Sequence, residues 1–231
     1  DVLSTSNQLL KKFPNSIMLH NICGAANKRM RKFDAAIYSY KCALSIKSDY
    51  AEAHYNLGNA FWEKGDRIAA IKSYRNAIKI KKDYTSAYYN LGNTLKEVGL
   101  VEEAQTNYKK AILIRPDFSE VFYNMGNTFK DKGDPVRAIE SYKKSAQIKP
   151  YFAEVYNNMG AALRQLGDLD AAIECYEKSL NLKPFIAATY NNRGEIFQEK
   201  GNLDSATKNF QIGLQIQPAL AEIYNSLAIV L

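Results

Sequence analysis

The chain has 231 residues, 46% of them hydrophobic, and a formal net charge of +7. No run of 18 apolar residues occurs, so the sequence predicts no membrane-spanning helix. The three cysteines, Cys23, Cys42 and Cys175, lack metal-ligand spacing and are odd in number. This predicts a reduced intracellular protein, which we place in the cytoplasm.

The strongest signal is a glycine that recurs every 34 residues, and Ala228 takes its next place. A strict period of this length predicts an array of small units with an extended binding surface instead of a catalytic pocket. The glycines are Gly24, Gly58, Gly92, Gly126, Gly160 and Gly194. The units aligned on them are 17–50, 51–84, 85–118, 119–152, 153–186 and 187–220.

The chain begins, on this division, with the end of a preceding second helix at 1–16. It ends with the first helix of a truncated seventh unit at 221–231. We therefore expect a piece of a longer protein. With positions numbered 1 to 34 in each unit, apolar residues at 4, 7, 8 and 11 predict a first helix. Those at 20, 24, 27, 28 and 30 predict a second.

A turn is predicted between the two helices, where glycine ends one helix and Asp or Asn caps the next. Leu100 replaces the capping residue in the third unit, so we expect a looser turn there. The turn residues are Gly65-Asp66, Gly133-Asp134, Gly167-Asp168 and Gly201-Asn202.

Small residues at positions 8 and 20 would let the two helices approach closely, and an aromatic residue at position 24 would fill the space beside them. One such hairpin cannot bury its apolar face alone, but stacked hairpins can. Position 20 is Ala36, Ala70, Ala104, Ala138, Ala172 and Ala206. Position 24 is Tyr40, Tyr74, Tyr108, Tyr142, Tyr176 and Phe210.

This unit resembles the tetratricopeptide repeat. The pattern is an aromatic residue or His at position 4, mostly Leu or Met at 7, Gly at 8, Ala at 20, Tyr or Phe at 24 and often Pro at 32. The resemblance covers 17–231 and continues upstream to Pro14. It implies an all-α fold, a right-handed superhelix (α-solenoid) of stacked antiparallel helix pairs, with first helices lining a concave surface.

No catalytic, cofactor or metal site is predicted. His20 and His54 both occupy position 4, where a packing aromatic is expected, and every glycine except Gly213 belongs to the repeat or its turns. Lysine or arginine at position 31 would complement helix C-termini. We favour that role over an acidic or nucleic-acid partner. This column is Lys47, Lys81, Arg115, Lys149 and Lys183.

The candidate site lies half a helical turn from the core positions of the first helix. Asparagine is a mediocre helix former, yet its amide can pair with both the C=O and the N–H of a passing peptide. Position 6 is Asn56, Asn90, Asn124, Asn158 and Asn192. Positions 9 and 5 add Asn59, Asn93, Asn127, Tyr55, Tyr89 and Tyr123. We predict that this asparagine ladder binds an extended peptide along the concave groove.

Two alternatives to the ladder remain open. The asparagines could be soluble residues inherited by duplication, and Trp62 could be either an aromatic anchor at the groove edge or inter-repeat packing. On either reading we expect alanine at Asn90, Asn124 and Asn158 to leave stability almost unchanged, because alanine is the better helix former.

The column is similar to the asparagine ladder of O-linked N-acetylglucosamine transferases. The cations of a carboxylate clamp are missing, and glutamates such as Glu52 would repel a carboxylate. Three functions follow: an interaction scaffold, the substrate-recruiting arm of a larger enzyme such as a glycosyltransferase, or self-association through exposed array ends. The apolar residues expected to be uncovered at the C-terminal end are Ile223, Leu227, Ile229 and Leu231.

Overall fold

The computed structural model describes residues 2–230, and every regular element in that range is an α-helix. The chain forms two compact units, residues 1–116 and 117–231. Unit 1 holds α1 (Val2–Lys12), α2 (Ile17–Arg29), α3 (Phe33–Ile46), α4 (Ala51–Lys64), α5 (Arg67–Ile80), α6 (Thr85–Glu97) and α7 (Val101–Ile114). Unit 2 holds α8 (Ser119–Asp131), α9 (Pro135–Ile148), α10 (Ala153–Gln165), α11 (Leu169–Leu182), α12 (Ala187–Glu199), α13 (Leu203–Ile216) and α14 (Ala221–Val230).

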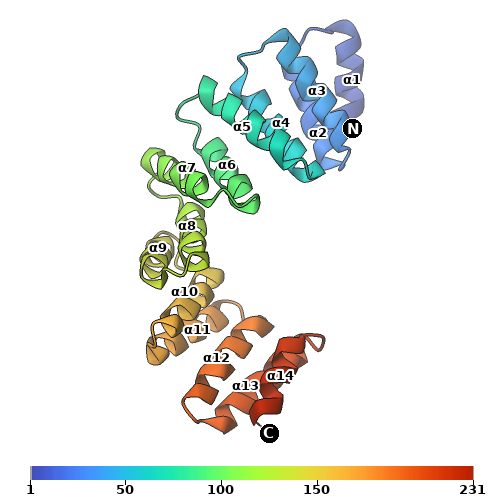
Figure 1. Ribbon diagram of the computed structural model, residues 1–231. Helices are drawn as coiled ribbons and strands as arrows, with labels where there is room; N and C mark the ends of the chain where they lie inside the picture. Colours follow the sequence, from blue (N-terminus) through green and yellow to red (C-terminus); the bar gives the residue numbers. More distant parts are fainter. Residues whose placement is uncertain (1, 231) are drawn as a thin grey trace. The chain divides into compact units, whose positions relative to one another are not determined.

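Consecutive helices pack as pairs, and each pair falls inside one 34-residue unit of the sequence. In unit 1 the pairs are α2/α3, α4/α5 and α6/α7, and each following first helix also packs on the second helix before it (Figure 1). Unit 2 repeats this order with α8/α9, α10/α11 and α12/α13, followed by α14 against α13. The predicted all-α architecture of stacked helix pairs is therefore confirmed.

The turns inside the pairs have the predicted cap chemistry. Gly65 has a φ of 95°, a left-handed conformation that favours glycine. The Asp66 carboxylate then accepts a hydrogen bond from the Ala69 N–H at 3.0 Å. Asp134, Asp168 and Asn202 cap their helices in the same way.

The turn at Leu100 is not looser, contrary to the sequence prediction. Gly99 keeps a positive φ of 83°, and the Leu100 N–H donates to Leu95 O at 2.9 Å. The Asp66 N–H makes the equivalent bond to Phe61 O, also at 2.9 Å. Backbone bonds therefore hold both turns, and only the side-chain cap is missing at Leu100.

Each pair is closed by the aromatic ring at position 24 lying against the glycine at position 8. A Cβ added to Gly92 would lie 2.5 Å from Cε1 of Tyr108, and one added to Gly58 would lie 2.6 Å from the same atom of Tyr74. These rings are fully buried. The absence of a side chain at position 8 is thus a packing requirement, as the spacing predicted.

The apolar residues at position 30, predicted to lie on the core face of the second helix, differ from expectation. At position 30, Ile46, Ile80, Ile114 and Ile148 are 37–40% exposed. They are the last residues of their helices, where the chain turns away and less of the neighbouring helix covers them. The cations at position 31 directly follow these residues as C-cap residues, which confirms their predicted place.

The predicted uncovered end is also wrong in part. Ile223 is fully buried and Leu227 packs against the same cluster, which includes Phe210 of α13. A first helix is covered by the second helix that precedes it, so the core face of α14 does not need a following helix. Ile229 is 73% exposed, and Leu231 lies outside the described residues.

We predict that Gly92→Ala destabilises the protein, because overpacking against the Tyr108 ring costs about 1–3 kcal/mol and outweighs the better helix propensity of alanine, about 1 kcal/mol. Urea denaturation should show the loss. In a Tyr108→Val background, which removes the ring, the same substitution should be neutral or stabilising. Equal losses in both backgrounds would contradict the packing argument.

We also predict that Leu100→Asp stabilises the protein by about 0.5–1 kcal/mol, because it supplies the missing side-chain cap of α7. The matched control is Leu113→Asp, which exchanges the same residue types at a site that is 83% exposed and far from an N-cap. A rise in the urea midpoint for both variants, or for neither, would count against the capping explanation.

Candidate functional site

All the residues predicted for a binding site lie on first helices and are half-buried. We call the surface they form in each unit the first-helix face. In unit 1 it comprises Tyr55, Asn56, Asn59 and Trp62 on α4 and Tyr89, Asn90 and Asn93 on α6. In unit 2 it comprises Tyr123, Asn124 and Asn127 on α8, Asn158 on α10 and Asn192 on α12.

The amide of Asn90 bridges to the preceding repeat in unit 1. Its Nδ2 donates both hydrogens, to Tyr55 Oη at 3.1 Å and to Asn59 Oδ1 at 2.9 Å. The same Asn59 oxygen accepts a hydrogen bond from Tyr74 Oη at 2.8 Å. Two tyrosines and two asparagines from neighbouring repeats therefore form one hydrogen-bonded network.

Unit 2 builds the same network from its own residues. Asn158 Nδ2 donates to Tyr123 Oη at 3.0 Å and to Asn127 Oδ1 at 2.9 Å. Tyr142 Oη donates to that Asn127 oxygen at 2.7 Å. Because the distances in the two units agree within 0.1 Å, the network is a property of the repeat and not of one location.

Other members of the column also donate backwards along the array. Asn56 Nδ2 donates to Asn21 Oδ1 at 3.1 Å, and Asn192 Nδ2 donates to Asn157 Oδ1 at 3.3 Å. The prediction that these amides only face solvent or a ligand is therefore incomplete, since their nitrogen atoms connect repeats. Asn90 and Asn158 use both Nδ2 hydrogens in this way, so neither can also donate to a peptide carbonyl.

The remaining capacity of the network is complementary. Within residues 2–230, Asn90 Oδ1 and the Nδ2 atoms of Asn59 and Asn127 have no hydrogen-bond partner in the protein. Asn90 thus presents an acceptor, and Asn59 and Asn127 present donors, whereas Asn158 Oδ1 already accepts one hydrogen bond from Asn157 Nδ2 at 3.2 Å. An amide offers both groups, so using one internally fixes which one is left.

The hydroxyls of the position-24 tyrosines were not predicted from the sequence, where these residues were expected only to pack as rings. The sequence carried only a weak signal: the three units with Asn at position 9 have Tyr74, Tyr108 and Tyr142 at position 24, but tyrosine also accompanies alanine at position 9 in two other units. Tyr108 Oη donates to Asn93 Oδ1 at 2.8 Å. Burial raises the pKa of Tyr74 and Tyr142 well above the usual value, which keeps these hydroxyls as donors.

Aromatic packing orients the position-5 hydroxyls that accept from the asparagines. The Tyr55 ring lies 6.0 Å from that of Tyr74 and 5.0 Å from that of Tyr84, centroid to centroid. In unit 2 the Tyr123 ring has the same two kinds of neighbour, Tyr142 at 6.1 Å and Phe152 at 4.9 Å. Tilted rings at these separations attract one another.

Trp62 makes an inter-repeat contact. Its Nε1 donates to the Glu97 carboxylate at 3.1 and 3.2 Å, and the guanidinium of Arg67 lies 4.8 Å from its ring centroid. Arg67 Nε also pairs with Glu97 at 2.5 Å. The indole donor is therefore engaged within unit 1.

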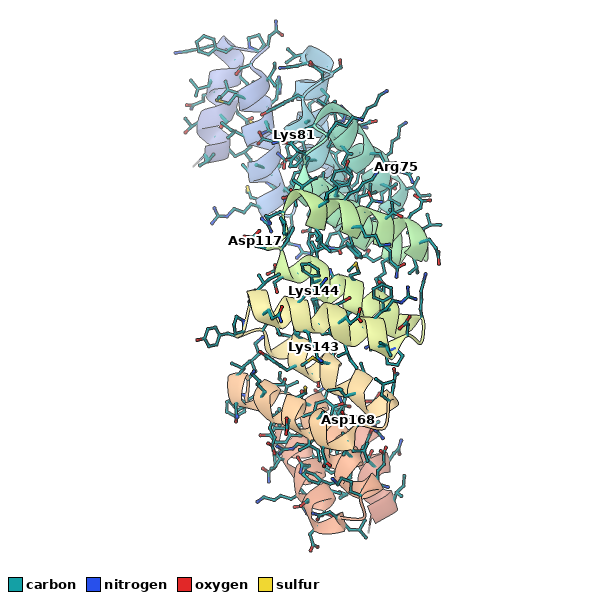
Figure 2. The ribbon with its side chains drawn as sticks, turned by 90° about the vertical axis from the view of Figure 1, so that its left-hand side faces the viewer. Arg75, Lys81, Asp117, Lys143, Lys144 and Asp168 are labelled. Atoms are coloured by element: carbon teal, nitrogen blue, oxygen red, sulfur yellow. The ribbon has the colours of Figure 1, made fainter. Side chains whose placement is uncertain are left out.

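Basic residues gather on the second helices. Arg75 on α5 and Lys143 and Lys144 on α9 are exposed (Figure 2), and Arg75 pairs with Glu103 at 2.7 Å. At position 31, Lys149 pairs with Glu120 at 3.0 Å. These cations belong to a different set of helices from the asparagines, which agrees with a structural role for the column at position 31.

The two histidines are packing residues, as predicted from their position. His20 Nε2 is 2.9 Å from Pro14 O, and His54 Nε2 is 3.0 Å from Ser48 O. Each ring thus ties its first helix to the loop before it. No helix within residues 2–230 has the length and apolar content to cross a membrane.

Models of a repeat family match five stretches, which together cover more than half of the chain. A TPR repeat model matches 32–65 and 68–99. Tetratricopeptide repeat models match 85–118, 119–152 and 153–185. No curated protein matches the chain in sequence.

Solved structures with the same fold are numerous, at low sequence identity. The APC/C hetero-tetramer Cut9-Hcn1 is 20% identical with a TM-score of 0.74; the match covers 98% of this chain and 45% of that one. YrrB, a TPR protein with an unusual peptide-binding site, is 20% identical with a TM-score of 0.69, covering 81% and 96%. PilF of Pseudomonas aeruginosa is also 20% identical, with a TM-score of 0.79, covering 92% and 97%.

We predict that Asn90→Ala destabilises the protein by about 1–2 kcal/mol, because two hydrogen bonds worth about 1 kcal/mol each are lost against a propensity gain of about 0.7 kcal/mol. This replaces the expectation from sequence that stability is unchanged. Asn181→Ala, at an exposed position of α11, is the control and should be neutral or slightly stabilising. Matching melting curves for Asn90→Ala and the unmodified protein would refute the network's structural role.

Proposed function

This chain belongs to the tetratricopeptide repeat family, and from this premise we propose that it binds an extended segment of a partner protein along its first-helix face. The twelve predicted residues on that face are the proposed contacts. The observation that carries the proposal is the residual hydrogen-bonding capacity of the network, in which Asn90 Oδ1 can still accept and the Nδ2 atoms of Asn59 and Asn127 can still donate.

This arrangement suits a peptide backbone better than other polymers. An extended peptide presents N–H donors and C=O acceptors along its length, and main-chain bonds of this kind give affinity with little dependence on side chains. Asn90 Oδ1 would accept from a backbone N–H, while Asn59 and Asn127 Nδ2 would donate to backbone carbonyls. A polyanion would use only the donors, so it would leave the acceptor unpaired.

The partner's backbone would meet atoms that are already held in place. Because Tyr55 and Asn59 fix the Asn90 amide before binding, little side-chain entropy is lost when a ligand arrives. YrrB, which has the same fold, carries a peptide-binding site, and this is consistent with the proposal.

A free-standing scaffold and the recruiting arm of a larger enzyme would use this face in the same way. The asparagine column is what makes the sequence similar to the repeat arrays of O-linked N-acetylglucosamine transferases. A glycosyltransferase arm is accordingly the second form of the proposal.

The test uses a peptide selected on the chain from a random twelve-residue display library and measured by calorimetric titration. We expect the double variant Asn90→Ala/Asn158→Ala to bind it about 30-fold more weakly, since two hydrogen bonds to ligand are worth about 2 kcal/mol. N-methylation of alternate backbone amides in the peptide should weaken binding similarly. Scrambling its side chains should matter less.

The matched control is Tyr74→Phe/Tyr142→Phe, which removes the inter-repeat bonds to Asn59 and Asn127 but keeps every first-helix amide. This pair should lose stability and keep its affinity within about threefold, a change of about 0.7 kcal/mol. Unchanged affinity in the asparagine double variant would exclude the ladder. An equal loss in both double variants would show that the asparagines act on binding only through stability.

A further inference from the structure

A pocket of about 380 Å³ opens between α10, α12 and α14 in unit 2. All three are first helices. Three of the lining residues occupy ladder positions, with Ser226 at position 6 and Glu195 and Ile229 at position 9; the other three are at positions 12 and 13. The pocket therefore lies where the asparagine pattern gives way to other residue types. The complete lining is Arg164, Glu195, Gln198, Glu199, Ser226 and Ile229.

The charged groups of the pocket are unequally satisfied. Arg164 Nη1 donates to Glu195 Oε2. Its Nε, at 2.8 Å, and its Nη2 both donate to Glu199 Oε1. Glu195 Oε1 also accepts from Asn191 Nδ2 at 2.7 Å. Both oxygens of Glu195 are thus engaged, whereas Glu199 Oε2 has no partner among the described residues.

The pocket favours a cation over an anion. Its lining carries one positive and two negative groups, a net charge of −1. An anionic ligand would have to displace the carboxylates that Arg164 already holds. A cation would contact Glu199 Oε2, which has no partner in the described part of the chain, and the neutral acceptor oxygens of Gln198 and Ser226. The cation would therefore have hydrogen-bond acceptors in the pocket.

The wall also suits the stem of a long side chain. Ile229 is 73% exposed and provides an apolar surface beside the acceptors. Lysine and arginine bury an aliphatic stem while their charged end stays in a polar setting. Ile229 can contact the aliphatic stem of such a side chain, while the neighbouring acceptors of the pocket bind its charged end.

We infer that this pocket binds a lysine or arginine side chain of the partner segment. The inference rests on the proposed function, because the basic residue would belong to the peptide lying on the first-helix face. It adds specificity: the backbone contacts tolerate many sequences, while this pocket selects a basic residue in the part of the segment that lies on unit 2.

The first test titrates Nα-acetyl-lysine N-methylamide into the ¹⁵N-labelled chain and follows the NMR signals of Gln198 and Ser226. Saturable shifts are expected with this probe and with its arginine counterpart. The norleucine counterpart keeps the stem and lacks the charge, so it should bind about two- to fivefold more weakly, as a partly exposed ion pair allows. Norleucine binding as tightly as lysine, or no shift with any probe, overturns the inference.

Substitution then assigns the interaction to one carboxylate. Glu199→Gln keeps an oxygen for Arg164 but removes the charge, and it should weaken lysine binding by the same two- to fivefold, about the value of a lost ion pair. Glu174→Gln makes the same exchange at an exposed position of α11 and should change nothing. Equal affinity in Glu199→Gln and the unmodified protein overturns the assignment.

Peptide selection separates this inference from the proposed function. Peptides selected on the unmodified chain should be enriched in one Lys or Arg position, and the enrichment should disappear on Glu199→Gln. Selected peptides that depend on Asn90 and Asn158 without basic enrichment would overturn the pocket and keep the ladder. If the lysine probe binds but the affinity of the selected peptides does not depend on Asn90 and Asn158, the pocket is kept and the ladder is overturned.

Discussion

The contact between the position-24 ring and the position-8 glycine sets the geometry on which the rest of each repeat depends. It is possible only because glycine has no Cβ; at Gly58 an added one would lie 2.6 Å from the Tyr74 ring. The ring so placed extends its hydroxyl to Asn59 on the first helix. Through Asn59 it fixes the amide of Asn90 in the next repeat. A packing contact inside one pair thereby determines a hydrogen-bonding pattern on the surface between two pairs.

The asparagines consequently have two roles that share one group of atoms. The nitrogen of Asn90 joins neighbouring repeats, and its oxygen is left for a ligand. A half-buried amide that is fully satisfied by water or protein is stable, but one that is orphaned is costly. This explains why a polar residue occupies a position between packed helices, where an apolar one would bury more surface. It also means that substitutions on this face alter stability and binding together.

Much of the fold followed from the repeat period, because caps, turns and the glycine column depend on residues close in sequence or in one hairpin. The asparagine network did not, since Asn90 meets residues 31 and 35 positions earlier. A pattern within one unit cannot show which atoms the next unit occupies. The same limit explains why the burial of Ile223 was not predicted, since the helix that precedes α14 covers it. It also explains the exposure of Ile80, which lies at the end of its helix, where less of the neighbouring helix covers it. Leu100 shows the opposite case, in which backbone bonds preserve a turn despite a missing side-chain signal.

The central claim is that position-6 amides are held by the preceding repeat while they face the binding surface. Hydrogen exchange of side-chain NH₂ groups, followed by ¹⁵N NMR, tests it most directly. The account predicts that the Asn90 NH₂ exchanges much more slowly than that of exposed Asn181, and that Tyr55→Phe speeds it by removing an acceptor. Equal exchange at Asn90 and Asn181, unaffected by Tyr55→Phe, would contradict the account.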